Sequence, residues 1–351
     1  MRRLAARLLG SQASGLLLVI IALSLALALC AGTHTDRRTG RLVNNFLNRH
    51  TLLQTATDAS FFAIMAVGAT LVIIAGGIDL SVGAVYSLAG VTMALTLRRL
   101  GPLSPLTTVA CGLALSLGVG ALAGLLNGLM IVGLPVHPFI ITLGTMWIFR
   151  GLAFVASRAE SILLPDALTA VVKLPLGAAG LYPIPMLTML VITALGAVYL
   201  SRTVMGRHIY AVGGNPEASR YAGLPIARIR VGVYVVAGLC AGIAAFLGSG
   251  FYGAASCADA TGYELYVIAS AVVGGASLSG GRGGAGNAML GALLIVLMRQ
   301  SIRTLRVDQN YEWIIIGAAI VVAVVLDQLN ARLALRRLLR KPDMTPPTTP
   351  T

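Results

Sequence analysis

The sequence predicts an all-α, polytopic bundle of transmembrane helices, and three observations support this fold class. Of the 351 residues, 57% are hydrophobic and only 11% are charged, and the mean hydropathy is +0.87. A soluble domain carries about 25% charged residues, so this composition cannot form a water-exposed surface. Long stretches contain no Asp, Glu, Lys or Arg, and one of them runs from Leu100 to Phe149. A membrane-spanning helix needs about 20 mostly apolar residues, so this stretch has room for two.

Clusters of glycine, proline and charge divide the apolar sequence into about ten helices. The helices are predicted near residues 12–32, 54–76, 80–97, 106–130, 136–156, 182–200, 231–251, 263–278, 285–301 and 311–327. The last three have charge-free cores shorter than the length of about 20 residues that a full span needs. Short or glycine-interrupted segments can also be broken or re-entrant helices that line a cavity.

The basic residues favour a topology with both termini in the cytoplasm. Lys and Arg are somewhat more frequent in the segments that this topology places inside, and an even number of helices agrees with it. The predicted layout is a cytoplasmic N-terminus (1–11), a transmembrane domain (12–327) and a cytoplasmic tail (328–351) that is basic at first and then disordered.

The formal net charge of +14 raises the question of nucleic-acid binding. The basic residues, however, lie between the apolar runs and at the ends of the chain instead of on one face. Arginines beside membrane spans are typical of contact with anionic lipid. The sequence therefore indicates a membrane-lipid environment and no nucleic-acid partner.

One polar stretch, residues 201–229, contains a short helix whose two ends are both specified. Asn215 can cap the free N–H groups, Pro216 suits the first helical position, and Glu217 favours the positive end of the helix dipole. Gly223 fits the left-handed position after the last turn. An ordinary loop with good caps is the alternative, but a helix so defined between two spans favours a docking element.

Asp79 lies between two uncharged stretches, two residues before Ser81. An ionised Asp in hydrocarbon costs about 2.5–3.5 kcal/mol or more, so it is expected to face protein or water. Asp79 can cap the next helix, or it can border a gate or a path through the membrane, and both roles can hold together. The surrounding pattern Gly76-Gly77-x-x-Leu80-Ser81 recurs as Gly274-Gly275-x-x-Leu278-Ser279. This is either an internal repeat or chance similarity in a chain with 41 glycines.

Several motifs match one known family along residues 45–327. They are the run from Ala66 to Gly83 that contains Gly-Gly-Ile-Asp-Leu-Ser-Val-Gly, Leu-Asn-Gly (126–128), Pro-Phe-Ile-Ile-Thr-Leu-Gly (138–144), Gly-Arg-His-Ile-Tyr-Ala-Val-Gly-Gly-Asn (206–215) with Ala222-Gly223, and Val-Val-Gly-Gly-Ala-Ser-Leu-Ser-Gly-Gly (272–281). With these motifs the chain resembles the permease subunits of ribose/xylose-type ABC sugar importers.

The resemblance implies a permease of the bacterial inner membrane that translocates a monosaccharide and needs no cofactor. Its implied partners are a separate ABC ATPase subunit with two fused nucleotide-binding domains, a periplasmic sugar-binding protein, and a second permease copy or paralogue. The segment 206–223 resembles the cytoplasmic helix that couples such permeases to the ATPase. The coupling residues implied are Gly213, Gly214, Asn215, Pro216, Glu217, Ala218, Arg220, Ala222 and Gly223.

Polar and glycine residues inside the apolar regions are the candidates for the translocation path or gate. They are Gly77, Asp79, Ser81, Asn127, Thr142, Gly274 and Gly275. An amide such as that of Asn127 suits sugar hydroxyls, although it equally suits a hydrogen bond between helices. One departure from the family is Tyr266, which stands where the family carries an Asp, and no role is carried over to it.

The sequence offers no catalytic apparatus. It contains no Gly-Lys pair and hence no Walker A motif, and it has no His/Cys cluster with metal-ligand spacing. ATP hydrolysis is therefore expected from a partner, and the chain is not expected to be an enzyme. The alternatives are an ABC permease for a nucleoside, a branched-chain amino acid or an autoinducer-type sugar, and an ion-coupled secondary transporter. The last would need buried acids, and Asp79 is the one candidate.

Overall fold

The computed structural model describes residues 12–35, 40, 42–176, 182–308, 310–315, 317–318, 321–322 and 325. Within these residues, seven helices are long and apolar enough to cross a membrane. They are α2 (Gln12–Cys30), α3 (Arg49–Ile74), α5 (Pro105–Gly133), α6 (Pro138–Ser157), α8 (Pro183–Arg202), α11 (Ile226–Tyr252) and α13 (Ala285–Thr304). The chain is thus an all-α polytopic membrane protein, as the sequence predicts.

The remaining elements complete the described part. The helices are α4 (Val82–Leu100), α7 (Asp166–Val172), α9 (Val204–Gly214), α10 (Pro216–Tyr221) and α12 (Tyr263–Val273). Two small antiparallel pairs, which the sequence did not predict, join β1 (Thr33–Thr35) to β2 (Leu42–Asn44) and β3 (Ile162–Leu163) to β4 (Ala254–Ala255). The predicted segments 1–11 and 328–351 lie outside the described residues. Within the helix predicted at 311–327, the described residues 311–315, 317–318, 321–322 and 325 are helical.

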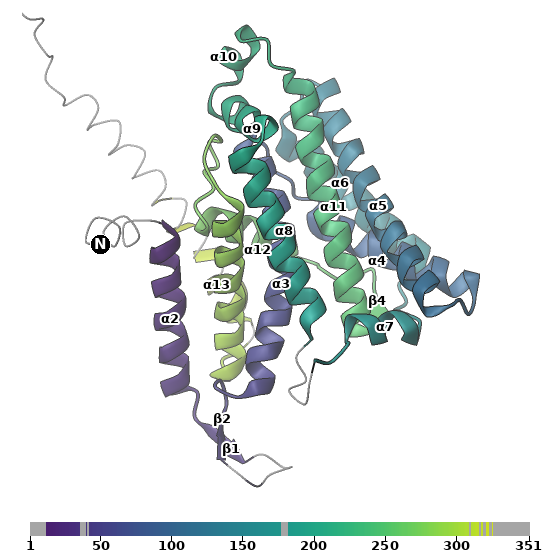
Figure 1. Cartoon of the computed structure of the whole chain (residues 1–351), viewed down its shortest axis with the longest axis vertical. Helices are drawn as coiled ribbons and strands as arrows, with labels where there is room; N and C mark the ends of the chain where they lie inside the picture. The colour runs from purple at the N-terminus through teal and green to yellow at the C-terminus, as the bar shows by residue number, and fades with distance from the viewer. Residues whose placement is uncertain are drawn as a thin grey trace, which may run out of the picture.

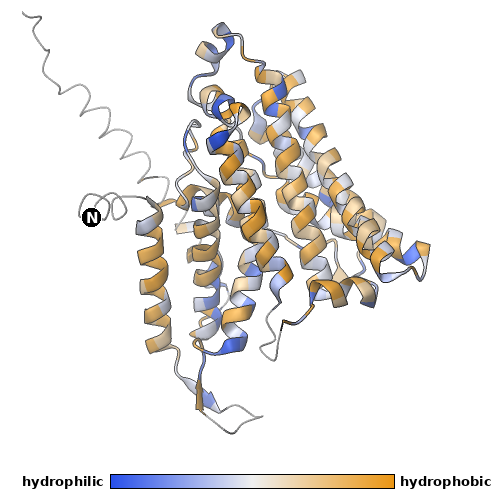
Figure 2. Cartoon of the chain, in the orientation of Figure 1, coloured by the Kyte–Doolittle hydropathy of each residue, from blue (hydrophilic) through white to orange (hydrophobic). Residues whose placement is uncertain are grey.

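Helix α3 is the centre of the bundle. In its most apolar window, 94% of the residues are buried, whereas the corresponding fractions for α2 and α8 are 11% and 17%. Helices α8, α9, α11, α12 and α13 pack around α3. The apolar faces of α2 and α8 are therefore largely exposed, as suits contact with lipid, and Figure 2 shows these helices as predominantly hydrophobic along their length.

Small residues bring α5 and α11 into close contact. Gly120, Gly124 and Gly128 recur every fourth residue on α5 and face the backbone of α11. A Cβ at Gly124 would lie 2.9 Å from the carbonyl carbon of Tyr234, and a Cβ at Gly128 would lie 2.8 Å from the Cα of Val231. Such spacing of small residues is the usual means by which transmembrane helices approach closely.

The bundle has two distinct ends (Figure 1). Helices α9 and α10 lie at one end, named the α10 end, and the β1–β2 pair lies at the other, named the β1–β2 end. Helix α3 runs from the β1–β2 end to the α10 end, and α4 returns toward the β1–β2 end. The break between α3 and α4, residues 75–81, therefore lies toward the α10 end.

Candidate coupling segment and helix-break site

The short helix predicted at 216–222 is present as α10, with the predicted caps. The Oδ1 atom of Asn215 accepts the Ala218 N–H at 2.9 Å, and Pro216 occupies the first helical position. After the last turn Gly223 has φ +77°, and the Leu224 N–H donates to the Ser219 carbonyl at 3.0 Å. This pattern is a Schellman motif, which satisfies the last carbonyls of the helix.

The rest of the polar stretch 201–229 is more helical than the sequence suggests. Residues 204–214 form a separate helix, α9, which Thr203 caps by accepting the Gly206 N–H at 3.0 Å. Helix α11 begins at Ile226, five residues before the predicted start at 231, since the apolar pattern begins only after Arg228 and Arg230. Most of this segment therefore consists of the two helices α9 and α10.

Helix α10 is exposed along nearly its whole length. Ser219 is buried, whereas Pro216, Glu217, Ala218 and Arg220 are exposed. Tyr221 is 85% exposed. In Figure 1 this helix projects beyond the end of the bundle. A projecting, capped helix with an exposed aromatic side chain has the shape of a docking element.

The C-terminal end of α9 packs against two chain segments that lie far apart in sequence, the end of α3 and the connection between α12 and α13. The Gly281 N–H donates to the Ile74 carbonyl at 2.9 Å, which joins the end of α3 to the connection between α12 and α13. Gly213 lies directly against this bond: a Cβ at that position would collide with the Ile74 carbonyl oxygen. The Tyr210 hydroxyl donates to the Gly283 carbonyl at 2.8 Å. The end of α9 is therefore in direct contact with both segments.

The two glycine pairs end α3 and α12 in the same way. Gly76 has φ +81°, and the Gly77 N–H donates to the Val72 carbonyl at 2.9 Å. Gly275 has φ +89°, and the following N–H donates to the Ala271 carbonyl at 2.9 Å. Both are Schellman ends, in which the left-handed residue is glycine because a Cβ is disfavoured there.

The apparent sequence repeat does not match this structural equivalence. The left-handed residue is the first glycine of the pair at 76–77 but the second of the pair at 274–275. Ser81 is the N-cap residue of α4, whereas Ser279 lies in the connection before α13. Both segments end a helix in the same way. The sequence pattern aligns Gly76 with Gly274, however, whereas the structure makes Gly76 equivalent to Gly275.

Four of the predicted path or gate residues form one buried cluster at the break between α3 and α4. The Oδ1 atom of Asp79 accepts the Ser81 N–H at 2.8 Å and the Ser81 hydroxyl at 2.7 Å. The Asn127 amide on α5 donates to the Ser81 Oγ at 2.7 Å. The hydroxyls of Thr142 on α6 and Tyr234 on α11 each donate to the Ile78 carbonyl at 3.2 Å.

This cluster fixes the break to three neighbouring helices. Asp79 is 6% exposed, and Ser81, Asn127 and Thr142 are fully buried. The sequence predicts that Asp79 can cap α4 by accepting N–H groups inside that helix. Its side chain instead accepts the N–H of Ser81, which is the N-cap residue of α4. The Asn127 Oδ1 atom has no hydrogen-bond partner among the described residues. Tyr234, which sequence reasoning missed, also contacts Gly77, where a Cβ would lie 2.6 Å from its hydroxyl.

Gly274 and Gly275 lie apart from this cluster. A Cβ at Gly274 would lie 2.5 Å from the Asn287 carbonyl oxygen on α13, so the two helices approach closely there. The two parts of the predicted site are linked through α9. Gly213 lies against Ile74, the last residue of α3, and against Gly280 and Gly281 in the connection that follows α12.

Replacing Asn127 by aspartate is expected to destabilise the protein by about 2–4 kcal/mol. The Ser81 hydroxyl gives its single hydrogen to Asp79, so an Asp at 127 would face an acceptor with no hydrogen and a second carboxylate nearby. Thermal unfolding in detergent measures the change. Asn127→Ala removes the donor without adding charge and is expected to cost less; equal melting temperatures for Asn127→Asp and the native chain would contradict this assignment.

A second polar cluster lies toward the β1–β2 end, and sequence reasoning missed it. The guanidinium of Arg150 on α6 donates to the carbonyls of Cys257 at 2.9 Å, Asp259 at 2.6 Å and Ala260 at 3.2 Å. Arg150 therefore holds the connection between α11 and α12. No sequence signal links these residues, which lie more than 100 positions apart.

Tyr266, at the position where the family carries an acid, takes part in an ionic network. Its hydroxyl donates to the Oε1 of Glu312 at 2.8 Å, and the same oxygen accepts the Nε–H of Arg299 at 2.6 Å. The Arg299 guanidinium also lies over the Tyr266 ring, 4.8 Å from its centroid, and over the Phe62 ring at 5.4 Å. The carboxylate near this position thus comes from Glu312.

Replacing Glu312 by glutamine is expected to cost about 2 kcal/mol, somewhat below the 3–5 kcal/mol of a fully buried pair. The side chains of Arg299 and Glu312 are 17% and 13% exposed, so Arg299 would lose a well-shielded counter-ion. Arg303 and Asp58 provide the matched pair: they lie 3.9 Å apart, and Arg303 is 44% exposed. Arg303→Gln is expected to cost less than about 1 kcal/mol. Melting temperatures that fall equally in both variants would refute this ranking.

Comparison with known proteins gives a consistent result. Residues 51–324 match the family described as "Branched-chain amino acid transport system / permease component". The chain is 33% identical over 287 residues to the D-allose transport system permease protein AlsC of Escherichia coli K12, covering 82% of this chain and 86% of that protein. It is 34% identical over 288 residues to the ribose import permease protein RbsC of Bacillus subtilis, covering 81% and 86%. The fructose import permease protein FrcC of Rhizobium meliloti is 32% identical over 300 residues, covering 84% and 82%.

The helical bundle and these matches define a multi-pass permease subunit of the bacterial inner membrane, which is not an enzyme. The chain belongs to the family of branched-chain amino acid transport system permease components, and its resemblance to the permeases of sugar importers is confirmed.

Proposed function

We propose that this chain is the membrane-spanning subunit of an ATP-binding-cassette importer that translocates a monosaccharide. The observation that carries the proposal is the similarity to permeases named for D-allose, fructose and ribose, which extends over more than 80% of this chain in each case. The family description names branched-chain amino acids, but it applies to the family as a whole. The similarity to individual sugar permeases favours a pentose or a related sugar over an amino acid or a nucleoside.

The proposed coupling element is α10 together with α9. The exposure of α10 suits a helix that enters a groove on the ATPase subunit. The contacts of Gly213 with Ile74 and Gly281 suit transmission of movement from α9 to the helix breaks. The coupling residues remain those predicted, from Gly213 to Gly223, with α10 as the docking surface and the end of α9 as the connection to the bundle.

The proposed gate is the break that contains Gly77, Asp79 and Ser81, together with the end of α12 at Gly274 and Gly275. Asp79, Ser81 and Asn127 are buried and bonded to one another, and the buried Thr142 donates to the Ile78 carbonyl in the same break. These bonds favour a hinge at the break over a surface that lines the translocation path. With α3 packed on all sides by other helices, a path between two permease subunits fits this chain better than one through its centre.

The complete transporter contains further parts in this proposal. The ATPase has two fused nucleotide-binding domains, a periplasmic protein delivers the sugar, and the second permease is a copy or a paralogue. The ten-helix topology with both termini in the cytoplasm puts α10 on the side of the ATPase. In an ion-coupled transporter, the exposed α10 and the close contact of Gly213 on α9 with Ile74 and Gly281 would have no role.

The substrate is tested by uptake of labelled sugars into vesicles that hold this permease with the ATPase and binding protein encoded beside it. D-Ribose, D-allose, D-fructose and D-xylose are compared with L-leucine and uridine. Saturable, ATP-dependent uptake of one of the sugars is expected. Uptake of leucine or uridine in place of any sugar would overturn the assignment of substrate class.

A further inference from the structure

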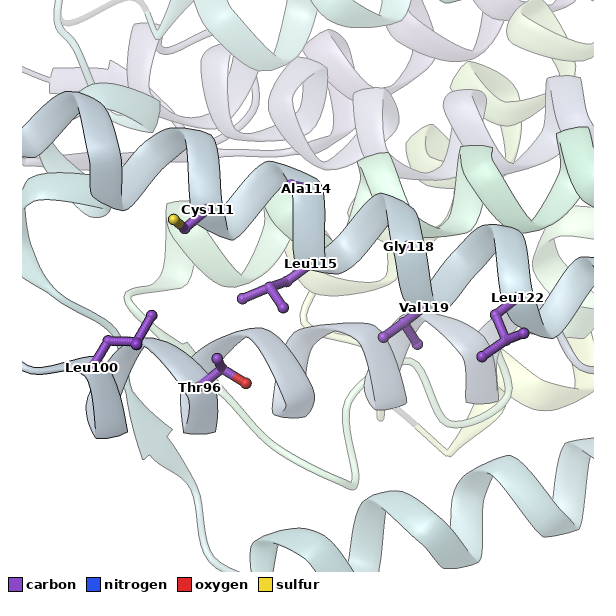
Figure 3. A pocket seen from close by; sticks show the side chains of 8 residues that line it. All are labelled: Thr96, Leu100, Cys111, Ala114, Leu115, Gly118, Val119 and Leu122. Atoms are coloured by element: carbon purple, nitrogen blue, oxygen red, sulfur yellow. The ribbon is translucent and has the colours of Figure 1, made fainter.

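A groove of about 490 Å³ lies between α4 and α5 (Figure 3). Its walls are the side chains of Thr96 and Leu100 on α4 and of a longer row on α5. The residues on α5 are Cys111, Ala114, Leu115, Gly118, Val119 and Leu122.

The groove is apolar in its chemistry. Thr96 is the one lining residue with a hydroxyl, and that hydroxyl donates to the Thr92 carbonyl at 2.8 Å within its own helix. At Gly118, no atom lies within 4 Å of where a Cβ would stand, so the groove is open at that point. The space therefore suits a hydrocarbon and offers no hydrogen bonds to a sugar.

The length of the groove matches one leaflet of a membrane. From Cys111 to Leu122 it follows α5 for about 16 Å, at a rise of about 1.5 Å per residue. The hydrocarbon core of a bilayer is about 30 Å thick, so half of it is about 15 Å. One acyl chain of a phospholipid has the right length to lie along this groove.

Two arginines lie at the mouth of the groove. Arg98 and Arg99 form the last turn of α4, directly before the lining residue Leu100, and both are exposed. Neither makes an ion pair with a residue that the structure describes. No acidic residue occurs between Asp79 and Glu160 in the sequence. Within the described residues, the mouth thus holds two exposed cations without an ion-pair partner at the end of an apolar groove.

We propose that this groove binds an anionic phospholipid, with one acyl chain between α4 and α5 and the headgroup phosphate at Arg98 and Arg99. Arginine pairs with phosphate through charge-assisted, often bidentate hydrogen bonds, and anionic lipid attracts basic residues at the membrane surface. The site does not depend on the substrate or on the coupling segment.

A second copy of this chain fits the groove less well. A two-fold interface brings the same surface patch of both copies together, at the same depth in the membrane. Arg98 and Arg99 of the two copies would then face each other, and residues 80–159 of either copy supply no acid between them. A lipid phosphate supplies the missing negative charge, whereas a second copy doubles the positive one.

The test is native mass spectrometry of the full-length protein in detergent, with phosphatidylglycerol or phosphatidylethanolamine of identical acyl chains. One phosphatidylglycerol is expected to remain bound per chain, at least fivefold more often than phosphatidylethanolamine.

Gly118→Leu fills the groove without a clash and is expected to reduce this binding at least tenfold. Gly151→Leu is the matched control, since Gly151 on α6 is exposed and has equally open space around it. The variant R98Q/R99Q is expected to remove the preference between the two lipids.

Two results would overturn the proposal. One is phosphatidylglycerol binding that neither Gly118→Leu nor R98Q/R99Q reduces. The other is an oxidative cross-link between two chains through Cys111, absent from Cys111→Ser, because a second copy would then occupy the groove. Thermal unfolding of each variant in the same detergent verifies that the protein is folded when its lipid binding is measured.

Discussion

Replacing Gly213 by alanine is expected to reduce substrate-stimulated ATP hydrolysis and uptake at least tenfold. The added Cβ would collide with the Ile74 carbonyl oxygen and would lie 2.8 Å from the Gly281 nitrogen, the two atoms that bond α3 to the α12–α13 connection. The end of α9 must then move away, and overpacking of this kind costs about 1–3 kcal/mol. Reconstituted proteoliposomes with the ATPase and the binding protein allow both activities to be measured.

The neighbouring residue provides a matched control for this effect. Gly214 also belongs to α9, but no atom lies within 4 Å of where its Cβ would stand. Gly214→Ala is therefore expected to keep both activities within about twofold of the native level, because alanine favours a helix over glycine. If Gly213→Ala and Gly214→Ala show the same ATP hydrolysis and the same uptake, the contact of Gly213 with Ile74 and Gly281 does not transmit movement.

Replacing Ala218 by glutamate is expected to prevent the ATPase subunit from binding while the permease stays folded. Ala218 is exposed and lies in the first turn of α10, where its N–H is bound by the Asn215 side chain. A glutamate at this position stabilises the start of a helix and can complete a capping box. The new carboxylate would, however, be buried without a partner in an interface, which costs several kcal/mol and lowers affinity at least a hundredfold.

Co-purification of the ATPase with the tagged permease measures this binding. Ala218→Ser adds a small polar group without charge and is expected to retain the complex. The melting temperature of Ala218→Glu alone should equal that of the native permease. A stable, fully stimulated complex with Ala218→Glu would show that α10 is not the contact with the ATPase.

Local signals predicted the capped helix well. Asn215, Pro216 and Gly223 act within a few residues of chain, so cap chemistry alone defines α10. The long spans were equally predictable, because a run of apolar residues specifies a membrane helix without knowledge of its neighbours. Helix α9 was missed because its residues 204–214 mix polar and apolar side chains and include three glycines, which indicate a loop when read alone.

The sequence named Asp79, Ser81, Asn127 and Thr142 as separate candidates but could not join them. Their contacts cross 46 positions between Ser81 and Asn127 and 64 between Ile78 and Thr142. The bonds of Arg150 cross 107 to 110 positions, and the bond between Tyr266 and Glu312 crosses 46, so the sequence did not join these residues either. Helix packing decides such pairs, and a hydropathy pattern contains no information on which helices are neighbours.

The most direct test of the whole account measures sugar uptake and ATP hydrolysis in the same proteoliposomes, with and without an ion gradient. Uptake is expected only when the ATPase, ATP and the loaded binding protein are all present, and the purified permease alone should hydrolyse no ATP. Sugar uptake by this chain alone, driven by a proton or sodium gradient in the absence of ATP, would contradict the account.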